Sequence, residues 1–169
     1  MSHSDRTRGH KLSSRVIASQ IKPIEGWSKV QPSRPKITIH KIARDSGYAT
    51  IAVNKEVELL MGVYDYKTYE FADEILRDYS NEELKKRFIE VGNRDKRANT
   101  KIDSIYTGKI GDISTLIVVH DFHMKNSGII GRVKYHYIIG AKGWISIGCG
   151  FKKEEEYLYV QEYEQILKL

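Results

Sequence analysis

The chain has 169 residues, of which 40% are hydrophobic and 30% are charged, and its formal net charge at neutral pH is +6. These values are typical of one globular domain with a real core, and they exclude a disordered or fibrous chain. No apolar run approaches the roughly 18 residues that a membrane-spanning helix needs, and the N-terminus lacks the apolar centre of a signal peptide. We therefore expect a soluble, cytoplasmic protein, with the mature form of an exported protein or lipoprotein as the alternative.

Much of the positive charge lies at the N-terminus. The opening "MSHSDRTRGHKLSSR" carries four basic residues against Asp5 and has no hydrophobic pattern. We interpret residues 1–14 as a flexible, polar, basic leader that is dispensable for folding, and residues 15–169 as a single α+β domain. Cys149 is the one cysteine, which excludes an intramolecular disulfide and a multi-cysteine zinc site, and we expect it in the core.

The first part of the domain reads as β-structure. Alternation in residues 12–24 is too weak to define a strand, and "IEGW" at residues 24–27 indicates a turn. The segments 36–42 and 48–53 alternate between apolar and polar residues, and "RDSG" at residues 44–47 supplies a turn between them. We therefore predict a β-hairpin here.

Helical spacing follows. Residues 69–79 carry an apolar stripe, with Thr68 available as a cap. The next segment, "SNEELKKRFIEVG", pairs Ser80 with Glu83 in a capping box and places Gly92 at the expected stop. The stripe of the first helix consists of Phe71, Ala72, Ile75, Leu76 and Tyr79, and that of the second of Leu84, Phe88 and Val91.

The rest of the chain predicts four strands and a closing helix. The strands cover residues 102–108, 114–124, 129–139 and 143–151, separated by turns that contain glycine. The helix covers residues 153–169 and has three glutamates at its start, where the helix dipole favours them. Its expected apolar side consists of Tyr159, Val160, Tyr163, Ile166 and Leu167. The order of elements predicts an α+β fold, an antiparallel β-sheet with helices packed on it.

The segment "HDFHMKNSGIIGRVKYH", residues 120–136, gathers three of the six histidines and could suggest a metal site. Side chains alternate between the faces of a strand, so His120 and His123 point to opposite faces and cannot share an ion. A turn at Ser127 and Gly128 would place Asp121 opposite Lys134 and His120 opposite Tyr135. A three-residue loop, residues 126–128, is the alternative, but it mixes charged and apolar residues on both faces.

The two-residue turn predicts a hairpin with one apolar and one polar face. His120 falls on the apolar face as a partly buried core residue, and we expect no metal and no cofactor. The polar face is our candidate binding surface, exposed to solvent or covered by a partner. Charge reversal at Arg132 and Lys134 would weaken a protein interaction and leave the fold intact. The polar face consists of Asp121, His123, Arg132, Lys134 and His136.

A second concentration of charge lies in residues 84–101, which carry seven basic side chains against Glu90 and Asp95. Our preferred interpretation is that these charges complement the dipole at a helix C-terminus and aid solubility. The alternative is a nucleic-acid-binding patch made of Lys85, Lys86, Arg87, Arg94, Lys96 and Arg97. No catalytic arrangement of residues can be assembled from the sequence, and neither "TGKIG" nor "GAKG" has the spacing of a phosphate-binding loop.

The segment "GRVKYHYIIGAKGWISIGCGFKKEEEYLYVQEYEQIL" resembles the closing unit of PsbP-like and DcrB-like α/β/α sandwiches, and "EGW" at residues 25–27 resembles their opening. The resemblance covers roughly residues 21–169. It implies a non-enzymatic accessory role, such as an assembly factor, an envelope-associated protein or a chaperone-like adaptor in a bacterium. The expected partner is a protein, with a homodimer, nucleic acid or an unrecognised enzyme site as alternatives.

Overall fold

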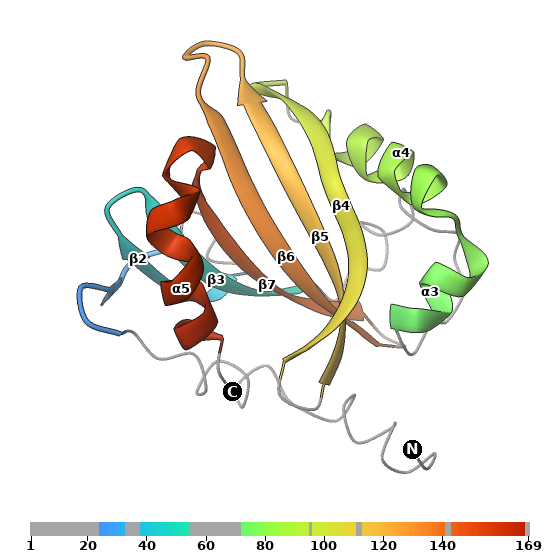
Figure 1. The fold of residues 1–169 in the computed structure, drawn as a ribbon, viewed down its shortest axis with the longest axis horizontal. Helices are drawn as coiled ribbons and strands as arrows, with labels where there is room; N and C mark the ends of the chain where they lie inside the picture. Colours follow the sequence, from blue (N-terminus) through green and yellow to red (C-terminus); the bar gives the residue numbers. More distant parts are fainter. Residues whose placement is uncertain are drawn as a thin grey trace.

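The computed structural model describes residues 24–32, 38–54, 72–94, 96–110, 113–140 and 143–167. Within these ranges seven strands form one antiparallel sheet in the order β1-β2-β3-β7-β6-β5-β4 (Figure 1). The strands are β1 Ser28–Lys29, β2 Thr38–Arg44, β3 Gly47–Asn54, β4 Ala98–Ile110, β5 Ile113–Met124, β6 Ile130–Gly140 and β7 Gly143–Lys152. The helices are α3 Ala72–Asp78, α4 Asn81–Gly92, the 3-10 helix η3 Lys153–Glu155, and α5 Glu156–Ile166. The predicted antiparallel α+β fold is confirmed.

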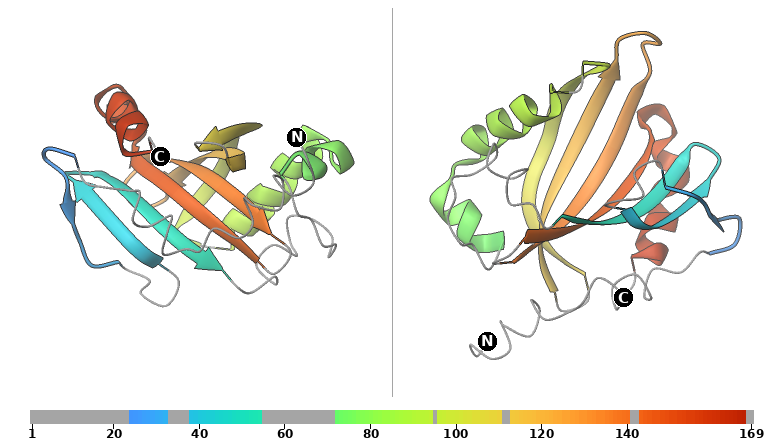
Figure 2. Two further views of the ribbon diagram at one scale, coloured as in Figure 1. Left: turned by 90° about the horizontal axis from the view of Figure 1, so that it is seen from below. Right: turned by 180° about the vertical axis from the view of Figure 1, so that it is seen from behind.

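Helices cover both faces of the sheet. Helix α5 buries Tyr159, Tyr163 and Ile166 in a cluster with Ile147 of β7, whereas α3 and α4 cluster with Tyr137 of β6. Ile147 lies opposite His136, the neighbour of Tyr137 along β6, so the two clusters occupy opposite faces. Figure 2 shows α5 over β7 and β3, and α3 and α4 at the other end of the sheet near β4. The arrangement is an α/β/α sandwich.

Two turns and one helix cap that the sequence predicts are present in the described residues. Trp27 N donates to Ile24 O at 3.0 Å in the first turn, and the β2–β3 hairpin turns at Asp45 and Ser46. Ser80 caps α4 by accepting a hydrogen bond from Glu83 N at 3.2 Å, as the capping box predicts. Thr68, Phe71 and the weak alternation before Ile24 lie outside the described residues.

Three expectations need correction. Strand β4 begins at Ala98, four residues before the predicted start, because Ala98 to Lys101 pair with the end of β5. Val160 is 44% exposed and lies away from the core side of α5, since Tyr159, Tyr163 and Ile166 already fill the contact with the sheet. The last turn of α4 carries no basic residue, and the basic residues expected near its C-terminus, Arg94, Lys96 and Arg97, follow the C-cap Asn93.

The β5–β6 hairpin has a longer turn than predicted. Met124 N donates to Ile129 O at 2.9 Å, so four residues, 125–128, form the connection, with Gly128 at a φ of +69°. Asp121 pairs with Arg132 instead of Lys134, and His120 with Val133 instead of Tyr135. The predicted register is therefore wrong by two residues. An even shift leaves every side chain on its predicted face.

Candidate functional site

Arg132 is the centre of a charged cluster that joins the β5–β6 hairpin to the start of α5. Its Nε and Nη2 donate to the two carboxylate oxygens of Asp121 at 2.8 and 3.0 Å, and its Nη1 donates to Glu156 Oε2 at 2.8 Å. Asp103 of β4 lies 3.3 Å from Nη2, and Lys153 Nζ lies 3.1 Å from Asp121 Oδ2. We call these five residues the Arg132 cluster.

Two side chains of the Arg132 cluster are largely buried. The side chains of Arg132 and Asp121 are 14% and 7% exposed, so the paired guanidinium and carboxylate are largely removed from water. Burial raises the pKa of Asp121, but hydrogen bonds from Arg132 and Lys153 outweigh it and hold that pKa below its usual value. The hydrogen bond to Asp121 raises the pKa of Arg132. Both groups are therefore charged at neutral pH, and each depends on the other.

Two predicted binding residues, Asp121 and Arg132, thus form an ion pair between β5 and β6, and Arg132 also binds the start of α5. Their geometry is a bidentate pair, which fixes orientation as well as charge. The expectation that Arg132 tolerates charge reversal does not fit this arrangement, because a reversed charge would leave Asp121 and Glu156 facing an anion. Asp121 is also occupied by two cations, so its oxygens are not available to a metal ion.

His136, a third predicted binding residue, is buried at 5% exposure on the same sheet face as Asp121. It lies opposite Ile117 on β5 and Ile147 on β7. Neither ring nitrogen has a hydrogen-bond partner among the described residues. Burial, together with a smaller effect of the neighbouring Lys134, lowers the pKa of His136 from 6.5 to about 4, so the ring is neutral at pH 7.

His123 and Lys134 are the two predicted binding residues that keep partial exposure. His123 lies opposite Ile130 near the end of the hairpin. Lys134 extends across the sheet face so that its Nζ lies 6.0 Å from the centroid of the Tyr106 ring, a cation–π contact. The structure therefore separates the predicted surface into buried Asp121 and His136, largely covered Arg132, and half-buried His123 and Lys134.

His120 packs among aromatic side chains on the opposite face of the sheet. Its ring is stacked on Phe122 at 5.6 Å and meets Phe88 and Tyr135 edge-on at 5.6 and 5.1 Å. It is 6% exposed, and neither ring nitrogen has a hydrogen-bond partner among the described residues. Burial lowers the pKa of His120 to about 4, against the opposing effect of Asp121. The prediction of a core histidine is confirmed.

The described residues include no group of three or more His, Cys, Asp or Glu side chains that could hold a metal ion. Buried Cys149 is a free thiol whose pKa burial raises to about 12. At neutral pH it is therefore protonated and a poor nucleophile. None of the described helices is long and apolar enough to cross a membrane.

The residues of the alternative nucleic-acid patch fall into two groups along the chain. Lys85, Lys86 and Arg87 lie in the first half of α4, and Arg87 binds Glu83 at 3.0 Å and stacks on Tyr79 at 4.8 Å. Arg94, Lys96 and Arg97 lie beyond the other end of the helix, next to the β5–β6 turn, where Lys125 N donates to Arg97 O at 3.0 Å. The nucleic-acid patch of these six residues stays a prediction.

Helix α5 exposes three large apolar side chains, of which the sequence analysis named only Val160, and that one as a core residue. Tyr157 is 78% exposed, and Leu158 and Val160 are each 44% exposed. On a helix, Tyr157 and Val160 are neighbours at i and i+3, and Glu164 continues the same stripe. The signal was present in the sequence as apolar residues outside the core stripe of Tyr159, Tyr163 and Ile166.

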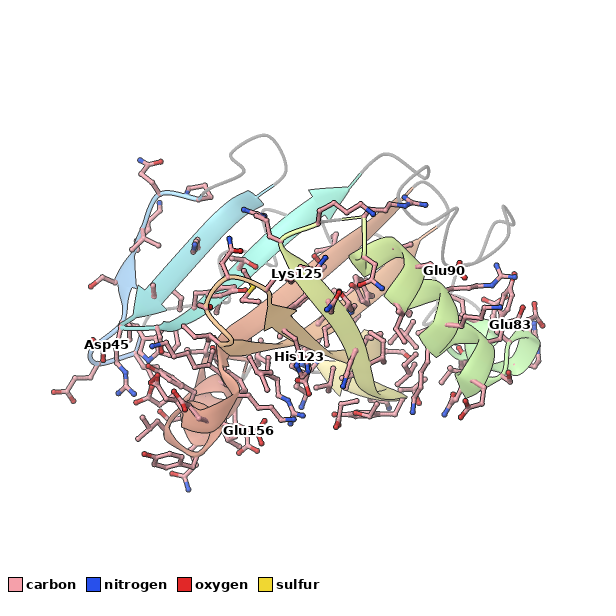
Figure 3. The ribbon with its side chains drawn as sticks, turned by 90° about the horizontal axis from the view of Figure 1, so that it is seen from above. Asp45, Glu83, Glu90, His123, Lys125 and Glu156 are labelled. Atoms are coloured by element: carbon pink, nitrogen blue, oxygen red, sulfur yellow. The ribbon has the colours of Figure 1, made fainter. Side chains whose placement is uncertain are left out.

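The position of α5 is fixed at both ends. Near its C-terminus Glu162 accepts hydrogen bonds from Trp27 Nε1 at 2.8 Å and from Arg44 Nη1 at 2.5 Å. Near its N-terminus Glu156 binds Arg132. Figure 3 shows Glu156 on α5 and His123 on the adjoining hairpin. The outward side of α5 is therefore held in a defined orientation by the rest of the domain.

A solved structure has a similar arrangement of strands and helices. The solution structure of cyanobacterial PsbP (CyanoP) from Synechocystis sp. PCC 6803 aligns with a TM-score of 0.53 and 6% identity, covering 85% of this chain and 80% of that one. The fold is PsbP-like. A crystal structure of PA94 from Pseudomonas aeruginosa, a protein of unknown function, aligns with a TM-score of 0.47 and 11% identity, covering 84% and 78% of the two chains. No protein-family model matches the sequence, and no curated protein does so either.

The PsbP-like fold confirms the expected fold class. At 6% identity the likeness carries the arrangement of strands and helices and no residue roles. A function for this chain is therefore inferred from its own surface residues.

Proposed function

We propose that this chain is a non-enzymatic accessory protein that binds another protein, and that the outward side of α5 is its main contact. The observation that carries the proposal is the exposure of Tyr157 on a helix that is fixed at both ends. Tyrosine combines a large apolar ring with a hydroxyl group and is enriched among residues that dominate protein interfaces. The PsbP-like fold and the accessory role that the family resemblance implies support the same class of function.

The neighbours of Tyr157 are suited to a protein partner. Val160 adds aliphatic surface on the next turn, and exposed Glu154 and Glu164 flank it with negative charge. Because an apolar centre with a charged rim is the usual composition of a protein interface, the partner should offer an apolar pocket flanked by basic residues. The negative charges disfavour a phosphate backbone at this surface.

His123 and Lys134 of the predicted binding surface stay candidates for a secondary contact, because both are half-buried. Asp121 and His136 are buried, and the guanidinium of Arg132 is engaged by Asp121 and Glu156. We propose that the Arg132 cluster contributes indirectly, by holding α5 against the hairpin.

A photo-crosslinking experiment tests the proposal in cells that express the full chain. A benzophenone amino acid replaces Tyr157 in one variant and exposed Lys109 of β4 in a matched control. We expect a discrete crosslinked protein at position 157 and none at position 109. Introducing Val160→Glu should reduce the crosslink, whereas Lys29→Glu on β1 should not.

The captured partner then allows a direct affinity measurement. Removal of one interface tyrosine costs about 2 kcal/mol, so Tyr157→Ala should weaken the Kd by roughly 30-fold. Equal crosslinking at both positions, or an unchanged affinity of Tyr157→Ala for the purified partner, would show that α5 is not the contact surface.

A further inference from the structure

The β5–β6 turn and the connection from α4 to β4 form one basic end of the molecule. Residues 93–97 and 124–129 contain four basic residues and one acidic residue, a net charge of +3. Arg94, Lys96 and Lys125 are exposed. The two segments are far apart in sequence, yet Ala98 pairs with Met124 and Lys125 N donates to Arg97 O at 3.0 Å, which places them side by side.

Hydrogen bonds hold this end in shape. Asn93, which follows α4, accepts a hydrogen bond through Oδ1 from Thr100 N of β4 at 2.9 Å. The turn is closed by Met124 N donating to Ile129 O at 2.9 Å and by Gly128 N donating to Met124 O at 3.0 Å. The basic side chains therefore project from a supported loop pair, which lowers the entropy that binding must overcome.

Two aliphatic side chains lie at the same place. Met124 and Ile129 flank the turn and are joined by a backbone hydrogen bond. They are 37% and 42% exposed. Figure 1 shows that the β5–β6 turn extends beyond the helices, and Met124 and Ile129 are the residues that close this turn. A single exposed aliphatic side chain needs no explanation, but a pair at a projecting tip among basic residues does.

We propose that this basic end, defined by Arg94, Lys96, Arg97, Lys125, Met124 and Ile129, attaches the protein to the surface of a membrane that contains anionic lipids. Basic side chains near such a surface are attracted by its negative potential, and aliphatic side chains enter the boundary between headgroups and acyl chains. A duplex nucleic acid is the other polyanion that four basic residues could bind. Exposed methionine and isoleucine side chains gain nothing from a phosphate backbone, and this favours the lipid surface.

The proposal extends the proposed function without depending on it. Helix α5, whose first residue Glu156 binds Arg132 near the same end of β6, carries the proposed protein contact, whereas the hairpin tip is a different segment with its own charge and apolar pair. In Figure 3, Lys125 lies at the β5–β6 turn and Glu156 lies on α5. Variants at one surface can therefore be compared with variants at the other.

Vesicle sedimentation tests the proposal with the full chain. Vesicles of phosphatidylcholine alone are compared with vesicles that also contain phosphatidylglycerol. We expect binding to the anionic vesicles, weakened by added salt, and little binding to phosphatidylcholine. Each basic residue near an anionic surface accounts for about a fivefold change in partitioning, so replacing Arg94, Lys96 and Lys125 by Gln should reduce binding on the order of 100-fold.

Matched variants separate the tip from general charge and hydrophobicity. Replacing exposed Lys29, Lys86 and Lys109 by Gln removes the same net charge elsewhere and should reduce binding far less. Met124→Ser with Ile129→Ser should weaken vesicle binding, whereas Leu158→Ser with Val160→Ser on α5 should not. The second pair would instead impair the protein contact proposed for α5.

Three outcomes would overturn the proposal. One is the absence of binding to anionic vesicles by the unmodified chain. Another is equal loss of binding in the tip and control charge variants. The third is duplex DNA or RNA binding that the tip charge variant abolishes and the Met124 and Ile129 variants leave unchanged, which would assign the basic end to nucleic acid.

Discussion

Arg132 lies directly opposite Asp121 in the β5–β6 hairpin and binds both oxygens of its carboxylate, at 2.8 and 3.0 Å. The same guanidinium reaches Glu156, the first residue of α5. One side chain therefore joins a hairpin to a helix that follows it by 24 residues. This ion pair adds to the apolar packing of Tyr159, Tyr163 and Ile166 in holding α5 on the sheet.

We expect Arg132→Met to destabilise the protein strongly. Removing one partner of a buried ion pair leaves the other charge without compensation, which typically costs about 3 kcal/mol or more. For a domain of this size that corresponds to a fall in Tm of roughly 6–12 °C. Thermal unfolding followed by circular dichroism measures it. Lys134→Met, two residues along β6, is the matched control and should shift Tm by a few degrees at most. Equal effects of the two changes would contradict a structural role for the Arg132 cluster.

Acid should destabilise the fold before the carboxylates titrate. The pKa of His120 and that of His136 are each lowered from 6.5 to about 4 in the folded protein, mainly by burial. Below about pH 6.5 the unfolded chain takes up protons at these positions and the folded chain does not, so stability is complete above that pH and falls below it. The loss should reach roughly 2–3 kcal/mol for each histidine by about pH 4.5.

Urea denaturation between about pH 7.5 and pH 4.5 measures this loss. Asp121, whose pKa is lowered, contributes to the pH dependence only at still lower pH. His120→Phe preserves the aromatic packing with Phe88, Phe122 and Tyr135 and removes the titrating group. We expect this variant to show a smaller loss of stability on acidification. An unchanged pH dependence would mean that His120 is not protonated on unfolding in this range.

Glu162 should be more important for stability than its neighbour Glu164. Glu162 accepts hydrogen bonds from Trp27 and Arg44, whereas Glu164 is exposed. Glu162→Gln places an amide donor where two donors already converge, which should cost about 2 kcal/mol. Glu164→Gln should change the free energy of unfolding by about 0.5 kcal/mol or less. Chemical denaturation of the two variants compares them directly, and similar values would show that the contact between Trp27 and α5 is not stabilising.

Deletion of residues 1–14 should leave the fold intact. These residues have almost no large apolar side chains to offset the entropy of ordering them. They lie outside the described residues, so this expectation comes from the sequence alone. The Tm of the shortened protein should stay within about 5 °C of that of the full chain, which for this size corresponds to 1–2 kcal/mol. A larger fall would show that the leader packs on the domain.

The sequence determined the periodic and local features of this protein. Alternation predicted the strands and their two faces, because side chains on a strand alternate whatever the partner is. The Ser80 and Glu83 pair predicted the start of α4, because a cap is made within one turn of helix. The core position of His120 also followed from alternation.

Only the tertiary structure decided which charges are structural and which are exposed. Arg132 and Lys134 lie on the same strand face and have similar local sequence, yet one is fixed by Asp121 and Glu156 and the other extends toward Tyr106. The difference depends on the position of Glu156 at the start of α5, a helix that follows β7 in the sequence. The hairpin register and the meeting of Arg97 with Lys125 depend likewise on pairing between distant segments, because local sequence fixes a residue's face but not the residue that it meets across the sheet.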